Sequence, residues 1–133
     1  MRVFELMQTD VQTVPSNAVV NDAVLVLAES RISALPVVDG AGRMVGVVSR
    51  TDVLASEEDA EDLAAREALF EKTLVRDIMT PRPLTIAPDA EVQEAAQQML
   101  YADVHRLFVT HGKRLIGVIS TTDIMRAVAT GQL

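Results

Sequence analysis

The chain has 133 residues, of which 49% are hydrophobic and 23% are charged, and it contains no cysteine. This composition is typical of one globular unit, or of two very small ones, and it excludes a disordered tail, a collagen-like fibre and a disulfide-stapled secreted miniprotein. The formal net charge is −7, of which residues 55–74 contribute −5 through seven acids and two bases.

An internal repeat organises the chain. When the sequence is shifted by 72 positions, Val3–Met7 falls on Val75–Met79. After one residue is dropped, Gly46–Asp52 falls on Gly117–Asp123. A unit of this size has difficulty burying its own apolar face, so we expect the two copies to pack on each other.

The first copy begins with a predicted short strand at Thr13–Val14. An amphipathic helix is predicted next, because Val20, Ala23, Val24 and Leu27 have the spacing of a single apolar helix face.

Two β-rich runs follow, Leu35–Val38 and Met44–Val48, around a glycine-containing turn at 39–42 that favours positive φ. A short helix from Asp52 ends the copy. The predicted order of elements is therefore β-α-β-β-α.

The second copy shows the same pattern. Its predicted elements are a strand at Thr85–Ile86, a helix with its stripe at Val92, Ala95, Ala96 and Met99, strands at Arg106–Val109 and Leu115–Ile119, and a helix from Asp123. Asn17 and Asp89 are the expected N-caps of the two middle helices. We divide the chain into a first repeat at 1–55, an acidic and helical linker at 56–74, and a second repeat at 75–133.

The turn between the last strand and the last helix carries the candidate chemistry. Ser49-x-x-Asp52 and Ser120-x-x-Asp123 fit a capping box, which is a purely structural interpretation. The functional interpretation is that the free N–H groups and positive end of the helix dipole suit an anion such as phosphate. In that case each Asp is placed to accept hydrogen bonds from the vicinal hydroxyls of a ribose.

The duplicated motifs Val-x-(Asp/Glu)-(Ile/Leu)-Met, Thr-(Val/Ile), Leu-(Pro/Phe)-Val and Gly-Val-(Val/Ile)-Ser-x-Thr-Asp resemble the tandem cystathionine-β-synthase (CBS) domain pair, or Bateman module. The resemblance covers nearly the whole chain except about residues 56–74. It implies an α+β fold of two pseudo-twofold-related β-α-β-β-α motifs packed through their sheets. It also implies clefts that hold AMP, ADP, ATP or S-adenosylmethionine in many relatives.

The resemblance further implies roles for individual residues. The ribose acceptors would be Asp52 and Asp123, each opening onto a groove. Ser49, Ser120, Thr51 and Thr122 would lie near phosphate, with Arg50 and Arg106 as cations. The adenine would meet Thr13, Val14, Thr85 and Ile86. The copies differ, because Ala34 corresponds to Arg106, Arg50 to Thr121, and Pro36 to Phe108, so phosphate handling should differ between the clefts. We expect Phe108 to be core.

We therefore expect a stand-alone regulatory module that senses an adenine nucleotide and signals to a separate, unidentified protein, as a homodimer in the cytoplasm. The alternatives are a ligand-free dimerisation or interaction scaffold, or a sensor of S-adenosylmethionine or NAD(H). An enzyme is not expected, because no nucleophile, base or metal constellation is visible.

Several further classes of partner are disfavoured. No row of Lys and Arg suits nucleic acid, and no apolar run suits a membrane span. His105 and His111 have no cysteine partner, so no metal site is expected. The methionines at positions 7, 44, 79, 99 and 125 are expected to fill gaps in the core.

Overall fold

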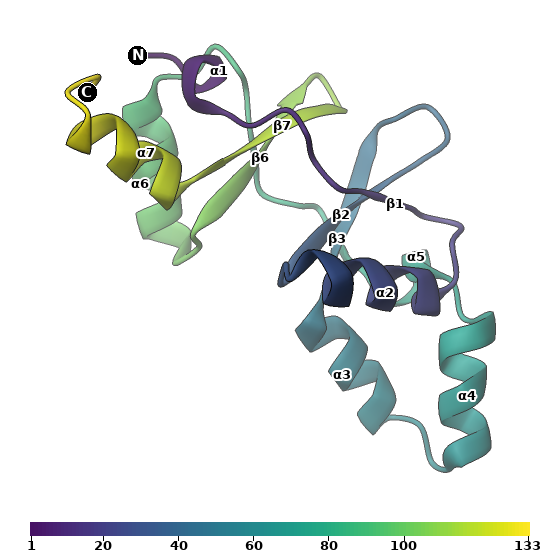
Figure 1. Cartoon of the computed structure of the whole chain (residues 1–133). Helices are drawn as coiled ribbons and strands as arrows, with labels where there is room; N and C mark the ends of the chain where they lie inside the picture. Colours follow the sequence, from purple (N-terminus) through teal and green to yellow (C-terminus); the bar gives the residue numbers. More distant parts are fainter. The chain divides into compact units, whose positions relative to one another are not determined.

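The computed structural model describes residues 1–133 as an α+β fold with two β-sheets (Figure 1). The residues divide into two compact units: a middle unit of residues 12–83, and a split unit that combines residues 1–11 with 84–133. The elements of the middle unit are β1 (Val14–Pro15), α2 (Val20–Ser30), β2 (Ala34–Val38), β3 (Met44–Ser49), α3 (Arg50–Glu58), α4 (Leu63–Lys72), α5 (Val75–Ile78) and β4 (Thr80–Pro81). Those of the split unit are α1 (Val3–Leu6), β5 (Thr85–Ile86), α6 (Val92–Ala102), β6 (Arg106–His111), β7 (Arg114–Ser120) and α7 (Thr121–Ala129).

Each unit holds its own sheet. In the middle unit the strand order is β1-β2-β3-β4, with β1 parallel to β2 and the other pairs antiparallel. In the split unit the order is β5-β6-β7, again with the first pair parallel and the second antiparallel. The predicted β-α-β-β-α order is confirmed in both repeats.

Separate hydrophobic clusters stabilise the units. In the middle unit, Leu35, Val37 and Val48 from β2 and β3 pack with the apolar face of α2. In the split unit, Leu107 and Ile119 hold the equivalent places beside α6. Phe108 is 7% exposed and belongs to the interior, as expected.

The repeats exchange their leading segments. Helix α1 stands at the start of the first repeat, yet it lies in the split unit, where Val3 joins the buried cluster. Helix α5 stands at the start of the second repeat and places Val75 in the cluster of the middle unit. The compact units therefore differ from the sequence segments 1–55, 56–74 and 75–133, because each repeat completes its core with the leading segment of the other.

The same exchange explains why the expected caps of α2 and α6 are wrong. These helices begin at Val20 and Val92, so their N-cap positions are Val19 and Glu91, and neither side chain caps the helix. The N–H of Val20 instead donates to the carbonyl of Thr73, just before α5, and the N–H of Val92 donates to the carbonyl of Met1, just before α1, both at 2.9 Å. A tertiary contact thus replaces Asn17 and Asp89.

The hairpin turns have the predicted backbone. Gly42 and Gly112 adopt φ of 80° and 65°, where a side chain would be strained. In the first turn, the Asp39 carboxylate accepts hydrogen bonds from the backbone N–H groups of Arg43 and Ala41 and from Nε of Arg43. These donors, the Arg43 backbone first, hold the pKa of Asp39 below its ordinary value of 3.8.

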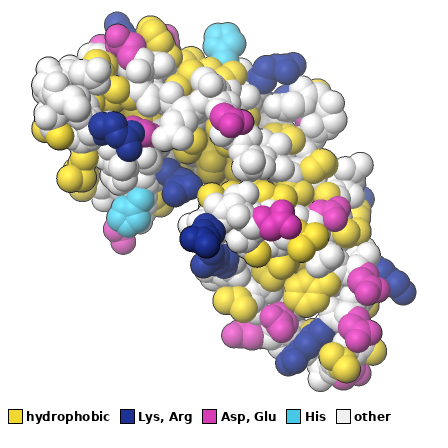
Figure 2. Space-filling view, viewed as in Figure 1, with side chains coloured by type: hydrophobic (Ala, Val, Ile, Leu, Met, Phe, Trp, Pro, Cys, Tyr) yellow, Lys and Arg dark blue, Asp and Glu magenta, His cyan; other side chains and the backbone are white.

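Residues 56–74 contain the last turn of α3 and the whole of α4. Asp62 caps α4 by accepting a hydrogen bond from the N–H of Ala65 at 2.8 Å. Phe70 packs against the cluster of the middle unit, whereas Leu63 faces solvent. Acidic and basic side chains alternate with apolar ones over α3 and α4 (Figure 2).

The methionines do not share one environment. Met44 and Met99 are buried, and Met7 and Met79 are half-buried beside the cores. Met125 is 70% exposed, so the expectation of a core position is wrong for this residue. It lies on α7 outside the buried face that contains Ala127.

No helix is both long and apolar enough to cross a membrane.

Candidate functional site

A capping box fixes the first candidate carboxylate. Strand β3 ends at Ser49 and α3 begins at Arg50, so Asp52 lies in the first turn of the helix. The Ser49 Oγ accepts a hydrogen bond from the N–H of Asp52 at 3.1 Å. In return, Oδ2 of Asp52 accepts from the N–H and Oγ of Ser49 at 2.9 and 3.0 Å. This oxygen is therefore committed to the fold, and the other oxygen, Oδ1, is the one available for further contacts.

The split unit repeats this geometry. The Ser120 Oγ accepts from the N–H of Asp123 at 3.2 Å, and Oδ2 of Asp123 accepts from the N–H and Oγ of Ser120 at 2.8 and 2.9 Å. Both sequence-predicted capping boxes are thus present. The structural interpretation of these motifs is confirmed, and it leaves one oxygen of each carboxylate for a second role.

Each remaining oxygen already contacts one side chain from an exchanged segment. Oδ1 of Asp52 accepts a hydrogen bond from Oγ1 of Thr80 at 3.1 Å. Oδ1 of Asp123 accepts from Nε2 of Gln8 at 3.0 Å and lies 3.5 Å from Nη1 of Arg126. Thr80 and Gln8 were not among the predicted site residues, although a shift of 72 residues superposes them directly after the aligned Met79 and Met7.

Two glycines allow the exchanged segments to come this close. A Cβ on Gly46 would lie 2.8 Å from the carbonyl oxygen of Thr80. A Cβ on Gly117 would lie 2.8 Å from the carbonyl oxygen of Gln8. Backbone atoms do not approach a side chain so closely, so glycine is required at both positions for Thr80 and Gln8 to reach the carboxylates.

The two carboxylates differ in exposure. We expected both carboxylates to open onto grooves. Asp52 is half-buried and still reaches solvent, but Asp123 is only 5% exposed and is covered by its neighbours. The difference agrees with their partners, because the longer Gln8 side chain and Arg126 cover Asp123, and only the short Thr80 side chain reaches Asp52.

The other candidates of the strand-to-helix turns lie at the surface. Arg50 and Thr51 occupy the first two positions of α3, and both side chains are exposed. Thr122 is exposed at the second position of α7, and Arg106 is exposed at the start of β6, directly opposite Ser120 in the sheet register. The middle unit thus has its cation on the helix, and the split unit has its cation on the neighbouring strand.

The candidates for contact with a base lie on the first strand of each sheet. Val14 is buried and pairs with Val37, while Thr13 directly before it is exposed. In the split unit, Ile86 is buried and Thr85 is half-buried. The backbone and the threonine side chains of these strands are therefore available to contact a base. The Val14 and Ile86 side chains are not, because they belong to the cores.

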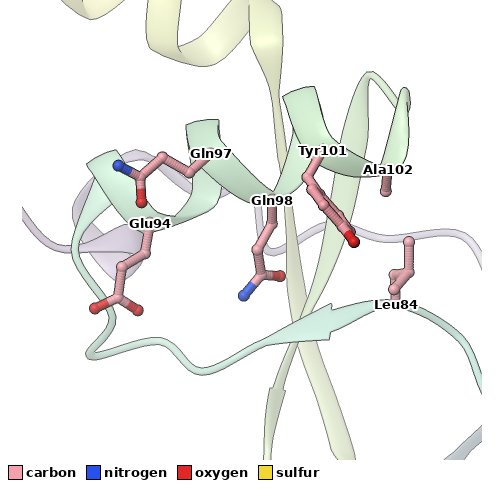
Figure 3. A pocket seen from close by; sticks show the side chains of 6 residues that line it. All are labelled: Leu84, Glu94, Gln97, Gln98, Tyr101 and Ala102. Atoms are coloured by element: carbon pink, nitrogen blue, oxygen red, sulfur yellow. The ribbon is translucent and has the colours of Figure 1, made fainter.

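Three shallow hollows lie within the units. One of about 290 Å³ lies between α2 and α3 and includes Arg50, and one of about 350 Å³ lies between α6 and α7 and includes Thr121 and Met125. The third, of about 340 Å³, lies along α6, where Tyr101 points toward Leu84 and Gln98 also lines the hollow (Figure 3). None of the predicted site residues lines this third hollow.

No cluster of three or more His, Cys, Asp or Glu side chains suitable for a metal ion is present.

Comparison with known proteins adds the family. Residues 3–59 and 75–130 match the family model of the CBS domain. The chain belongs to the CBS domain family. Both CBS domains cover the strand, hairpin and capping-box helix described above, so the resemblance seen in the sequence is confirmed, and the chain is a tandem CBS pair.

Individual relatives agree with this assignment. The chain is 30% identical over 145 residues to the CBS domain-containing protein CBSX1 of Arabidopsis thaliana, covering 93% of this chain and 61% of that protein. It is 33% identical over 124 residues to the 5'-AMP-activated protein kinase subunit gamma-3 of Homo sapiens, covering 90% of this chain and 24% of that subunit. The chain thus spans about a quarter to three fifths of the length of these curated relatives.

A solved structure of CBSX2 in complex with AMP superposes on the chain with a TM-score of 0.82. The sequences are 29% identical, and the match covers 99% of this chain and 98% of that chain. CBS pairs of this architecture therefore include one that holds AMP.

Proposed function

We propose that the chain is a regulatory module that binds an adenosine-containing ligand of the AMP, ADP or ATP class and signals to a separate partner protein. The observation that carries the proposal is the pair of carboxylates with one oxygen fixed by a capping box and the other facing a hydrogen-bond donor. Ribose offers vicinal hydroxyl donors of this kind. The AMP complex of CBSX2 supports the choice of ligand class.

In this proposal Asp52 accepts hydrogen bonds from a ribose. Its Oδ1 has one partner, Thr80, and a carboxylate oxygen has room for a second donor. The half-buried position keeps the carboxylate reachable while partial desolvation strengthens a hydrogen bond to it. Asp123 plays the equivalent role in the second CBS domain.

The phosphates of the ligand would lie over the helix N-termini. Ser49, Arg50 and Thr51 surround the first turn of α3, where the positive end of the helix dipole and the Arg50 side chain favour an anion. Ser120 and Thr122 stand at the equivalent end of α7, with Arg106 opposite Ser120. The base would contact the strand ends at Thr13–Val14 and Thr85–Ile86. None of these groups forms a nucleophile and base pair, so we propose binding without turnover.

The test is thermal and chemical unfolding with AMP, ADP or ATP, each with and without Mg²⁺. A binding nucleotide at a hundredfold excess over its Kd raises the free energy of unfolding by about 2.7 kcal/mol. The substitution Asp52→Asn keeps the shape and one acceptor of the capping box and should reduce this rise. Asp22→Asn is a matched control, since Asp22 holds the same helical position in α2 and is exposed.

Other outcomes discriminate the alternatives. If only S-adenosylmethionine or NAD(H) raised the free energy of unfolding, the chain would still be a ligand-binding regulatory module, but its ligand would not be an adenine nucleotide of the AMP, ADP or ATP class. Unfolding that no nucleotide affects would leave a ligand-free interaction scaffold. Conversion of a nucleotide by the purified protein would contradict the proposal of a non-enzyme.

We also propose a homodimer as the working form. Leu100 is 83% exposed on α6, and Met125 and Val128 are exposed on α7. Leu25 and Leu54 are similarly exposed on α2 and α3. Apolar helix faces of this kind are typical of association surfaces, and a twofold assembly would cover the same face on both copies. Sedimentation should give a dimer for the wild type and a monomer for Leu100→Glu with Met125→Glu, while Leu84→Glu, an exposed leucine outside these faces, stays dimeric.

A further inference from the structure

Thr80 and Gln8 are equivalent residues that treat equivalent carboxylates differently. Each follows a short helix of an exchanged segment, and each pairs through its backbone with the second strand of its unit's hairpin, Thr80 with Val47 of β3 and Gln8 with Val118 of β7. Two hydrogen bonds of 2.8 and 2.9 Å join Gln8 to Val118. The backbone therefore presents both side chains to the carboxylates in the same way, and the carboxylates differ through the chemistry of these side chains and through Arg126, which approaches only Asp123.

The Thr80 hydroxyl leaves its carboxylate open. It is exposed, it is the one side chain beyond Ser49 that hydrogen-bonds the Asp52 carboxylate, and it can rotate to accept a hydrogen bond as well as donate one. An incoming hydroxyl can therefore bind Oδ1 of Asp52 beside Thr80 without breaking an existing contact.

The Gln8 amide closes its carboxylate. Nε2 is a donor only, it lies 3.0 Å from Oδ1 of Asp123, and Nη1 of Arg126 approaches the same oxygen at 3.5 Å. With both donors in place the carboxylate is 5% exposed. A ligand hydroxyl must displace Gln8, which is itself exposed and free to swing out, and must replace a hydrogen bond to a charged group.

We propose that Gln8 is a built-in occupant of Asp123 that makes the second CBS domain the weaker of the two ligand subsites. This inference rests on the proposed function and adds the order of occupancy: the Asp52 subsite fills first, and the Asp123 subsite fills after Gln8 has moved. Loss of one hydrogen bond to a charged group corresponds to a difference of about tenfold or more in affinity.

Two reciprocal substitutions test the role of Gln8. Gln8→Thr gives the second subsite the side chain of the first, and Thr80→Gln does the reverse. Both positions are exposed and keep their backbone pairing, and thermal unfolding of each variant verifies its fold. The probe is AMP, measured by isothermal titration calorimetry on the full chain.

The wild type should bind AMP at two subsites with affinities about tenfold or more apart. Gln8→Thr should tighten the weaker subsite toward the stronger one, and Thr80→Gln should weaken the stronger one. In ¹⁵N NMR spectra, the side-chain NH₂ signals of Gln8 should move only in the second, weaker phase of the titration.

Two equal subsites in the wild type, or a weaker subsite unchanged by Gln8→Thr, would overturn the role of Gln8 while the proposed function stands. Absence of AMP binding in the wild type and in both variants would instead reject AMP as the ligand and, with it, this order of occupancy.

Discussion

The backbone N–H of Val75 donates to the carbonyl oxygen of Ala18 at 2.8 Å, although Val75 opens the second repeat and Ala18 belongs to the first. Val3 makes the equivalent bond to Ala90 at 2.9 Å. Each repeat is therefore completed by the first residues of the other, and both valine side chains are fully buried.

The first prediction follows from this exchange. Val3→Ala should loosen the strands of the second repeat, and Val75→Ala should loosen those of the first, each by about 1–3 kcal/mol for a buried apolar truncation. Native-state hydrogen exchange of the β6 and β7 amides, compared with those of β2 and β3, measures this. The two variants control for each other. If Val3→Ala sped up exchange in β2 and β3, or Val75→Ala in β6 and β7, the exchange of segments would be contradicted.

The second prediction concerns the close approach at Gly46 and Gly117. Replacing either by Ala should cost about 1–3 kcal/mol, because the new methyl group meets backbone oxygen atoms that must move. Denaturant unfolding gives the free energy. Gly40→Ala is the control and should be nearly neutral, since its Cβ would meet no atom within 4 Å and its φ is not positive. Equal effects at all three positions would argue against the steric explanation.

The third prediction separates two methionines of the α6 and α7 pair. Met99 is 2% exposed within the cluster of the split unit, so Met99→Ala should cost about 2–5 kcal/mol. Met125 is exposed, so Met125→Ala should change the free energy of unfolding by less than about 0.5 kcal/mol. Urea unfolding of dilute protein checks both values. A large loss from Met125→Ala under these conditions would show that α7 packs differently.

The fourth prediction concerns acid. The pKa of Asp39 is lowered, so its charged form contributes stability above the ordinary value of 3.8, and this contribution disappears as the pH falls through the lowered pKa. An NMR titration of the Asp39 carboxyl carbon should show a midpoint below 3.8. Arg43→Ala should raise this midpoint only in part, because the backbone N–H groups of residues 43 and 41 still donate. A return to the ordinary value would make the guanidinium the main cause.

The repeat and its periodicity predicted the fold well. The apolar stripe at Val20, Ala23 and Leu27 lies buried, and both hairpins and both capping boxes are present. These features depend on residues close in sequence, and for that reason a pattern in one segment suffices to indicate them.

The parts that could not be predicted depend on distant residues. The caps expected from Asn17 and Asp89 fail because the N–H groups of Val20 and Val92 find carbonyls on segments far along the chain. The partners of Asp52 and Asp123 were missed for the same reason, since Thr80 and Gln8 reach them only through strand pairing. A local pattern carries no information on which remote segment fills a gap.

The exchanged segments also set an order for folding during synthesis. The middle unit is continuous from residue 12 to residue 83, so the elements that pack together in it emerge from the ribosome one directly after another. Helix α1 is made before the middle unit, yet its packing partners around Ile119 are made after it. Val3 therefore stays uncovered while the whole middle unit between it and these partners is translated.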